Sequence, residues 1–227
     1  MYEKYIKRFF DVILCSAALV VLSPIFLITA LAIKISSPGS VFYYSDRASK
    51  NKRPFHFYKF RSMHNVDAKH KQKDLYTADQ DRLFMVGKII RKLKIDELPQ
   101  LINVIKGDMS IIGPRPMPIS SVDRQYCGKY SGILDVKPGL SSAASLYDYI
   151  VGERFADDEE MYRKNIVPVK LELELLYLKK QSFWYDFCMV LRTINTIALV
   201  SIGTKEFREL PELSELNLKS EEVEKNG

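Results

Sequence analysis

Cysteine and histidine are scarce in this chain, with three of each among 227 residues. The cysteines (Cys15, Cys127 and Cys188) lie far apart in the sequence, so they supply neither a disulfide framework nor a zinc site. The histidines also lack the spacing of metal ligands, and we assign them no role. These absences indicate a protein that faces a reducing compartment such as the cytosol.

The sequence also contains no internal repeat and no low-complexity run. Apolar residues make up 47% and charged residues 27%, which excludes a fully disordered, collagen-like or coiled-coil chain. Helix-turn-helix, zinc-finger and RNP-type motifs are missing, so we expect no nucleic-acid partner. The length suits one well-packed domain with a short appendage.

The net charge of +6 is unevenly distributed along the chain. Residues 1–63 carry ten Lys or Arg against three Asp or Glu, whereas residues 205–227 carry four against seven. The basic region indicates an anionic partner, such as lipid headgroups or a phosphorylated small molecule. The acidic end has few large apolar residues, which predicts a disordered tail over residues 205–227.

One uncharged run of 22 residues, between Asp11 and Lys34, is long enough to lie in lipid. As a straight helix it would measure about 33 Å, against a hydrocarbon core of about 30 Å. The run is too long for a signal peptide, and no small-x-small cleavage site follows it. We therefore assign residues 1–36 to the membrane, with a buried helix of a soluble domain as the alternative.

Two features predict that this helix enters and leaves the membrane on the same side. Pro24, at its centre, removes a backbone hydrogen bond and bends the helix, and the Ser23 hydroxyl could satisfy a carbonyl that the break frees. Lys and Arg flank both ends, and the positive-inside rule places such flanks in the cytoplasm. A re-entrant helix broken at Ser23-Pro24 satisfies both flanks. A kinked helix that spans the membrane is the alternative.

Residues 37–204 predict one mainly α-helical cytosolic domain with a small β or extended element. Aromatic-rich stretches on either side of the basic turn ASKNKR (48–53) predict two short strands or extended arms joined by that turn. Residues 66–80 are polar and predict a loop or an exposed helix. From residue 82 the apolar residues recur at helical spacing, with lysine and arginine on the opposite face.

Helical periodicity returns over residues 169–200. Trp184 and Tyr185, beside basic residues, suit an amphipathic helix at the lipid–water interface, although periodicity alone fits a core helix equally well. Aromatic-rich interfacial helices of this kind would also allow a homodimer.

Asp96 and Glu97 are the first of three features that together indicate phosphate chemistry. A helix is predicted to begin there, with Asp96 as its N-cap and Pro99 in its first turn. The N–H groups at such a position favour anions. Adjacent carboxylates could also share a divalent cation, with one carboxylate left as a nucleophile.

The other two features are basic. Lys88, Arg91 and Lys94 precede the acidic pair, and Arg115 lies in the stiff sequence Gly-Pro-Arg-Pro (113–116), which suits bidentate phosphate recognition. Each feature alone has an ordinary structural explanation. Their combination beside a membrane segment indicates a site.

The segment KIDELPQLINVIKGDMSIIGPRP (94–116) resembles the signature of the bacterial sugar transferases, the monotopic polyprenyl-phosphate phosphoglycosyl transferases. The N-terminal segment with its Ser-Pro pair, FYKFRSM (57–63) and VKPGL (136–140) are further similar blocks in the same order. The resemblance covers about residues 1–200.

This resemblance implies a two-step transfer at the cytoplasmic face of the bacterial inner membrane, the first membrane step of glycoconjugate assembly. An aspartate attacks the sugar-bearing phosphate of a UDP-sugar and releases UMP, and polyprenyl (undecaprenyl) phosphate then accepts the sugar phosphate. By resemblance, Asp96 is the nucleophile and Glu97 helps to hold Mg²⁺. The resemblance also implies phosphate contacts from three basic residues and support from two further residues. These are Lys59, Arg91 and Arg115 for phosphate, with Glu174 and Pro116 as support.

The sequence departs from the family pattern in one region that bears on the substrate. PGLSSAASLYDYIVGER (138–154) replaces a frequent PGITGWAQVNGR segment, so the donor sugar stays open. Two other functions also fit the residues: a membrane-anchored glycosyltransferase that releases UDP, and a non-enzymatic binding module tethered to the membrane. A binding module would tolerate Asp96→Asn, whereas a phosphoglycosyl transferase would not.

Overall fold

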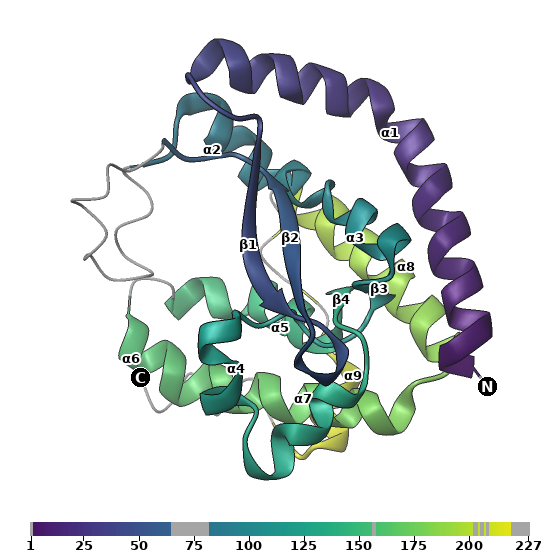
Figure 1. Cartoon of the computed structure of the whole chain (residues 1–227). Helices are drawn as coiled ribbons and strands as arrows, with labels where there is room; N and C mark the ends of the chain where they lie inside the picture. The colour runs from purple at the N-terminus through teal and green to yellow at the C-terminus, as the bar shows by residue number, and fades with distance from the viewer. Residues whose placement is uncertain are drawn as a thin grey trace.

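The computed structural model describes residues 2–64, 82–155, 158–201, 204, 207 and 209–218. The described chain is mainly helical, as predicted, and has two small sheets, one of which was not predicted (Figure 1). Its long helices are α1 (Arg8–Ser36), α7 (Val167–Lys180) and α8 (Phe183–Ser201). The predicted loop or helix at residues 66–80 lies outside the described residues.

The remaining helices and strands are short. The α-helices are α2 (Met85–Lys92), α3 (Gln100–Lys106), α4 (Ile119–Gln125), α5 (Ala143–Ile150), α6 (Glu159–Met161) and α9 (Pro211–Glu215). The strands are β1 (Phe42–Ala48), β2 (Pro54–Phe60), β3 (Ser110–Ile112) and β4 (Gly139–Ser141). Short segments of 3₁₀ or π helix are η1 (Tyr2–Lys7), η2 (Lys50–Lys52), η5 (Ile95–Glu97), η6 (Gly128–Asp135), η7 (Gly152–Phe155) and η8 (Tyr162–Ile166).

Helix α1 bends midway along its length and arches along the outside of the molecule (Figure 1). The helix continues through Pro24, so the Ser23-Pro24 pair lies within one bent helix and does not interrupt it. Pro24 has no N–H to donate to the Val20 carbonyl four residues earlier. The Ser23 hydroxyl donates to that carbonyl at 2.8 Å, which confirms the role predicted for it.

The two ends of α1 pack against the body of the protein, whereas its middle does not. Residues 7, 11, 15, 29 and 33 are buried, and none between 16 and 28 is. Val20 and Val21, for example, are about three-quarters exposed, at 75% and 74%. By length and composition, Tyr2–Ser36 and Phe183–Val200 are the two described helices that could cross a membrane.

Strands β1 and β2 form the predicted antiparallel hairpin. Their connecting turn contains no glycine, and instead Asn51 and Lys52 adopt positive φ angles of 57° and 59°. The hairpin packs against α3 through Asn103, which is buried. Its side-chain amide donates to the carbonyl of His56 at 2.7 Å and accepts from the N–H of Tyr58 at 3.1 Å. Asn103 therefore bonds β2 much as a neighbouring strand would.

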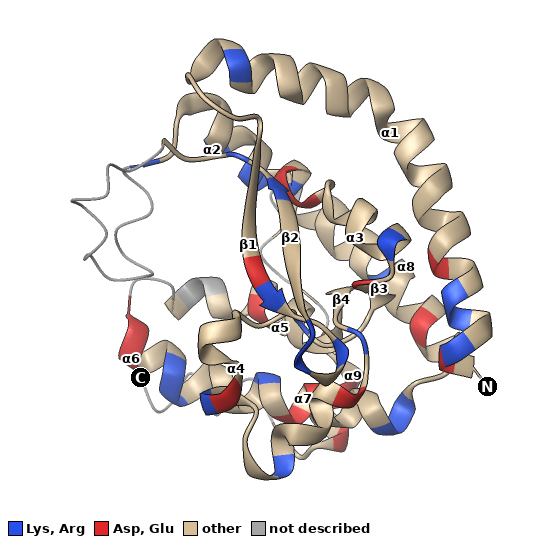
Figure 2. Ribbon diagram, viewed as in Figure 1, with Lys and Arg blue, Asp and Glu red and all other residues tan. Residues whose placement is uncertain are grey.

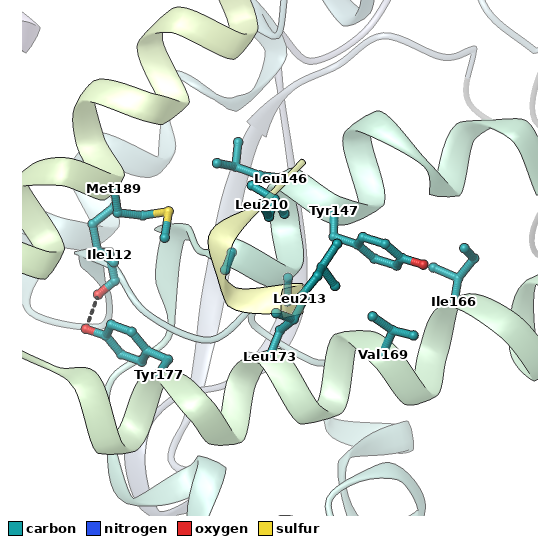
Figure 3. Packing of buried hydrophobic residues seen from close by; sticks show 12 residues of the cluster. Ile112, Leu146, Tyr147, Ile166, Val169, Leu173, Tyr177, Met189, Leu210 and Leu213 are labelled. Carbon is teal, nitrogen blue, oxygen red and sulfur yellow. Dashed lines mark hydrogen bonds between the residues drawn. The ribbon is translucent and has the colours of Figure 1, made fainter. Parts of the chain in front are cut away.

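The largest apolar core lies between α5, α7, α8 and α9 (Figure 3). Tyr177 of α7 crosses this core, and its hydroxyl donates to the carbonyl of Ile112 in β3 at 3.2 Å. Leu210 and Leu213, at the start of α9 and within it, are also buried there. The prediction of a disordered tail is therefore wrong for residues 210–218.

The reason for that error is the spacing of a few leucines within an acidic segment. Leu210, Leu213 and Leu216 recur at three-residue intervals, and all three contribute to the core cluster. Glu212 does not stay in solvent either, because Arg192 of α8 donates to both of its carboxylate oxygens at 2.8 Å. The average composition of the segment concealed this apolar stripe.

Helix α8 presents an apolar face that the described part of the body leaves uncovered. Trp184 is 72% exposed, and Phe187, Leu191 and Ile194 are also exposed. Tyr185 points the other way, and its hydroxyl donates to Glu212 at 2.9 Å. Helix α8 is therefore not an ordinary core helix, and its exposed face has the composition expected of an interfacial helix.

Leu213→Ala is expected to lower the free energy of unfolding by about 2–5 kcal/mol, because it leaves a cavity in the core. Glu215→Ala, two residues away, removes only an exposed ion pair with Lys180, so its effect should stay below about 0.5 kcal/mol. Urea unfolding of the detergent-solubilised protein measures both. Equal stability of Leu213→Ala and the wild type would contradict the packing of α9.

Candidate active site

The acidic pair lies in a tight turn between α2 and α3. Lys94 adopts a positive φ of 56°, which reverses the chain after α2 and leads into the 3₁₀ turn η5. Helix α3 then begins at Gln100, with Pro99 in the capping position. The prediction that Asp96 is the N-cap of this helix is therefore wrong, because a separate 3₁₀ turn comes first.

Asp96 is a buried carboxyl group, with 4% of its surface exposed. Burial raises its pKa to about 6, and the nearby charges of Lys59, Lys94 and Arg91 offset this only in part. Its Oδ1 atom is buried and has no hydrogen-bond partner. A carboxylate with an unused oxygen and a raised pKa is typical of a group that acts on a ligand.

Glu97 has the opposite character. The Lys59 ammonium of β2 donates to its Oε1 at 2.8 Å. Burial alone would raise the pKa of Glu97, but Lys59 and Arg115 outweigh it and lower the pKa to about 2. Figure 2 shows acidic and basic residues close together where β2 passes the turn before α3. The two neighbouring carboxyls therefore ionise at widely separated pH values.

Arg115 lies on a loop whose backbone is fixed on two sides. Strand β3 leads into it and pairs with β4, and a Cβ on Gly139 would lie only 2.1 Å from the Gly113 nitrogen. Only glycine allows this approach. On the other side, the N–H of Arg115 donates to Oε1 of Glu174 at 3.0 Å. Tyr126 donates its hydroxyl to Oε2 of the same carboxylate at 3.0 Å.

The predicted site residues thus divide into groups. Four of them come together: Asp96, Glu97, Lys59 and Arg115. Arg91, in the last turn of α2, is close enough to lower the pKa of Asp96. Glu174 accepts hydrogen bonds from the Arg115 N–H and the Tyr126 hydroxyl, and the Pro116 carbonyl accepts one from Arg47 at 3.2 Å. Ser23 and Pro24 lie in the exposed middle of α1.

Three residues that shape this site were not predicted from the sequence: Asn103, Tyr126 and Tyr149. Asn103 holds β2, and hence Lys59, against α3, and Tyr126 holds Glu174. The Lys94 ammonium lies 4.4 Å from the ring centroid of Tyr149, which connects α5 in the divergent segment with the turn that carries Asp96. An asparagine inside a helical apolar stripe was the one visible signal, because such a residue usually bonds to backbone.

The site fits Mg²⁺ in one limited sense. No group of three or more His, Cys, Asp or Glu side chains that could hold a metal ion occurs among the described residues. Mg²⁺, however, is often bound through one or two carboxylates together with substrate phosphates. Asp96 has a free Oδ1 and lies beside Glu97, so this pair could supply the protein's share of such a shell.

These features define a class of protein that has an apolar N-terminal helix and a site where paired carboxylates lie beside basic residues. Such a site suits phosphate esters. The chain belongs to the bacterial sugar transferase family, whose profile matches residues 2–199.

Curated relatives agree with this family. The chain is 40% identical over 203 residues to a UDP-N-acetylgalactosamine-undecaprenyl-phosphate N-acetylgalactosaminephosphotransferase of Aeromonas hydrophila, covering 88% of this chain and 45% of the relative. It is 34% identical over 195 residues to a UDP-glucose:undecaprenyl-phosphate glucose-1-phosphate transferase of Escherichia coli, covering 85% and 40%. This chain therefore spans less than half the length of these two relatives.

A relative of similar length also matches. The chain is 35% identical over 206 residues to the uncharacterized sugar transferase EpsL of Bacillus subtilis, covering 88% of this chain and 91% of the relative.

Glu174→Gln is expected to remove a pH dependence of stability. Burial raises the pKa of Glu174 to about 7, so the folded state holds its proton longer than the unfolded state does. Stability should therefore fall as the pH rises from about 4.5 to about 7, by about 3 kcal/mol. Glutamine stays neutral and still accepts from the Arg115 N–H. Urea unfolding at pH 4.5 and pH 8 measures the difference.

The control for this experiment is Glu172→Gln, which changes a neighbouring acid of α7 that bonds Lys129 and Tyr130 at the surface. It should leave the fall in stability intact. An equal fall in Glu174→Gln and the wild type would contradict the buried, proton-holding state of Glu174.

Proposed function

We propose that this protein is a phosphoglycosyl transferase that moves a sugar 1-phosphate from a UDP-sugar to undecaprenyl phosphate and releases UMP. The observation that carries this proposal is the buried Asp96, whose pKa is raised to about 6 and whose Oδ1 has no partner. The names of the Aeromonas and Escherichia relatives favour the same two substrates.

In the first step, an oxygen of the ionised Asp96 attacks the phosphorus that bears the sugar. The new O–P bond forms as the bond between the two phosphates breaks, and UMP leaves with the bonding electron pair. Glu97 suits this role less, because Lys59 binds its Oε1 in an ion pair and lowers its pKa. Arg115 and Lys59 offset the negative charge of the phosphates.

In the second step, a phosphate oxygen of the acceptor lipid attacks the same phosphorus, and the Asp96 oxygen leaves as a carboxylate. A covalent intermediate divides one difficult displacement into two easier ones. Mg²⁺, held by Asp96 and Glu97 with the donor diphosphate, would neutralise charge on the leaving phosphate. The first step needs Asp96 unprotonated, and its pKa of about 6 leaves it mostly ionised at neutral pH.

The acceptor carries its phosphate at the membrane surface, so the active site must lie at that depth. We propose that α1 is a re-entrant anchor whose two ends both face the cytoplasm at the inner membrane. Its buried ends, its exposed apolar middle and its basic flanks support this arrangement. The uncovered face of α8 would lie in the interface beside it.

Asp96→Asn is expected to lower UMP release by about a thousandfold or more, because an amide cannot replace the attacking carboxylate. The assay incubates the full chain with Mg²⁺, undecaprenyl phosphate and a panel of UDP-sugars, one of which also identifies the donor. Wild-type release should need Mg²⁺ and fall about tenfold from pH 7 to pH 5, as Asp96 takes up its proton.

The control variant is Asp46→Asn, which removes an exposed carboxylate paired with His56 in the hairpin. Its UMP release should match that of the wild type. Without acceptor, the sugar phosphate of a labelled donor should stay on the wild-type protein and not on Asp96→Asn. Release of UDP in place of UMP would point to a glycosyltransferase and overturn the proposal, as would full activity of Asp96→Asn.

Site-directed cysteine labelling is expected to find both ends of α1 on one side of the membrane, in variants that otherwise keep only the buried Cys15. Lys4 and Ser40 are exposed at the two ends, and each can be changed to cysteine in a Cys127→Ser, Cys188→Ser background. A membrane-impermeant maleimide should label both positions in inside-out vesicles and neither in right-side-out vesicles. Leu27→Cys, in the exposed middle of the helix, should resist labelling from either side.

Labelling of the two end positions from opposite sides would show that α1 spans the membrane. That result would reject re-entrance and leave the reaction chemistry untouched.

A further inference from the structure

The N-terminal end of α1 contacts the segment that connects the two halves of the proposed active site. Residues 98–114 run from Glu97 to Arg115 and contain α3 and β3. Helix α3 begins just after the acidic pair, and β3 ends just before the Arg115 loop. The placement of these two elements therefore sets the distance between the paired carboxylates and Arg115.

Arg8 binds the end of α3. Its guanidinium donates through Nη1 to the carbonyl of Val104 and through Nη2 to the carbonyl of Ile105, the latter at 2.6 Å. Carbonyls in the last turn of a helix lack partners within the helix and carry its negative dipole end, so a cation there is favourable. Arg8 thus fixes α3 at the end opposite to Asp96.

Asp11 binds the free edge of β3. Strand β3 pairs with β4 on one side, where Ser110 is opposite Gly139 and Ile112 is opposite Ser141. The N–H of Ile111 points to the other side and donates to Oδ1 of Asp11 at 3.1 Å. The hydroxyl of Ser110 donates to Oδ2 at 2.7 Å. Asp11 is only 5% exposed, so these bonds satisfy a buried carboxylate and a backbone N–H together.

We propose that Arg8 and Asp11 are positioning residues for the transfer reaction. Through them, the apolar helix fixes α3 and β3 relative to each other, and so fixes Asp96 and Glu97 relative to Arg115. This inference rests on the proposed function, and it gives α1 a part in catalysis in addition to anchoring. A displacement of about 1 Å between groups that act on one phosphate can cost about 100-fold in rate.

The test compares Asp11→Ala with Asp11→Asn in the full chain reconstituted in nanodiscs. Asp11→Ala removes both acceptors, and kcat for UMP release should fall by about 100-fold. Asparagine keeps Oδ1 as acceptor for the Ile111 N–H, and its amide nitrogen can donate to the Ser110 hydroxyl, so Asp11→Asn should recover most of the activity. Melting temperature is measured in parallel, and kcat is expressed per folded molecule.

The matched control is Glu3→Ala. Glu3 also ties the N-terminal end of this helix to the body, through an ion pair with Lys50 at 2.9 Å, but Lys50 lies outside residues 98–114. Its loss should leave kcat unchanged. A lower melting temperature with unchanged kcat per folded molecule in Asp11→Ala would mean a merely structural role and would overturn the inference.

Two further measurements keep the test decisive. If Asp11→Ala does not fold, Ser110→Ala takes its place, because it removes one of the two hydrogen bonds, and an unchanged kcat would overturn the inference.

If the wild type releases no UMP, the proposed function fails, and hydrogen exchange of residues 110–115 then decides the positioning question. Faster exchange in Asp11→Ala or Ser110→Ala, but not in Glu3→Ala, supports it, and unchanged exchange overturns it.

Discussion

The ion pair between Lys59 and Glu97 is the contact on which the chemistry of this protein depends. Two carboxylates adjacent in sequence would ordinarily share one environment and ionise at similar pH values. Lys59 binds Glu97 and, with Arg115, lowers its pKa to about 2, whereas burial raises the pKa of Asp96, whose Oδ1 has no hydrogen-bond partner, to about 6. One carboxylate then stays charged, and the other can change its protonation near neutral pH.

This ion pair in turn depends on backbone contacts made elsewhere. Lys59 can reach Glu97 because Asn103 bonds β2 to α3 and fixes the position of the hairpin relative to that helix. Arg115 approaches the same pair because Gly113 and Gly139 allow β3 and β4 to come together. Glu174 fixes the Arg115 loop by accepting a hydrogen bond from the Arg115 N–H. Elements far apart in the sequence therefore position the charges of the site through bonds to backbone groups.

Much of this could be predicted from the sequence, because the signals were local. The apolar run and the two strands around the basic turn follow from patterns within single stretches of sequence. The network of Glu174, Tyr126 and the Arg115 N–H could not be derived from pattern, because it joins residues up to 59 positions apart. The N-cap assignment of Asp96 failed because the left-handed Lys94 introduces a turn that propensity does not reveal. The prediction of a disordered acidic tail was wrong because the packing of three leucines outweighs the charge of the segment.

The bent helix α1 also has a mechanical consequence. A straight span adapts to bilayer thickness by tilting, at a cost of a fraction of a kcal/mol per Å of mismatch. Helix α1 has buried residues near both ends, at Asp11 and Ile33, packed against the same body, so it cannot tilt without disturbing that packing. In a bilayer, hydrophobic mismatch would therefore be absorbed by the surrounding lipid. Lipid chain length then becomes a variable that acts on this protein through deformation of the membrane around it.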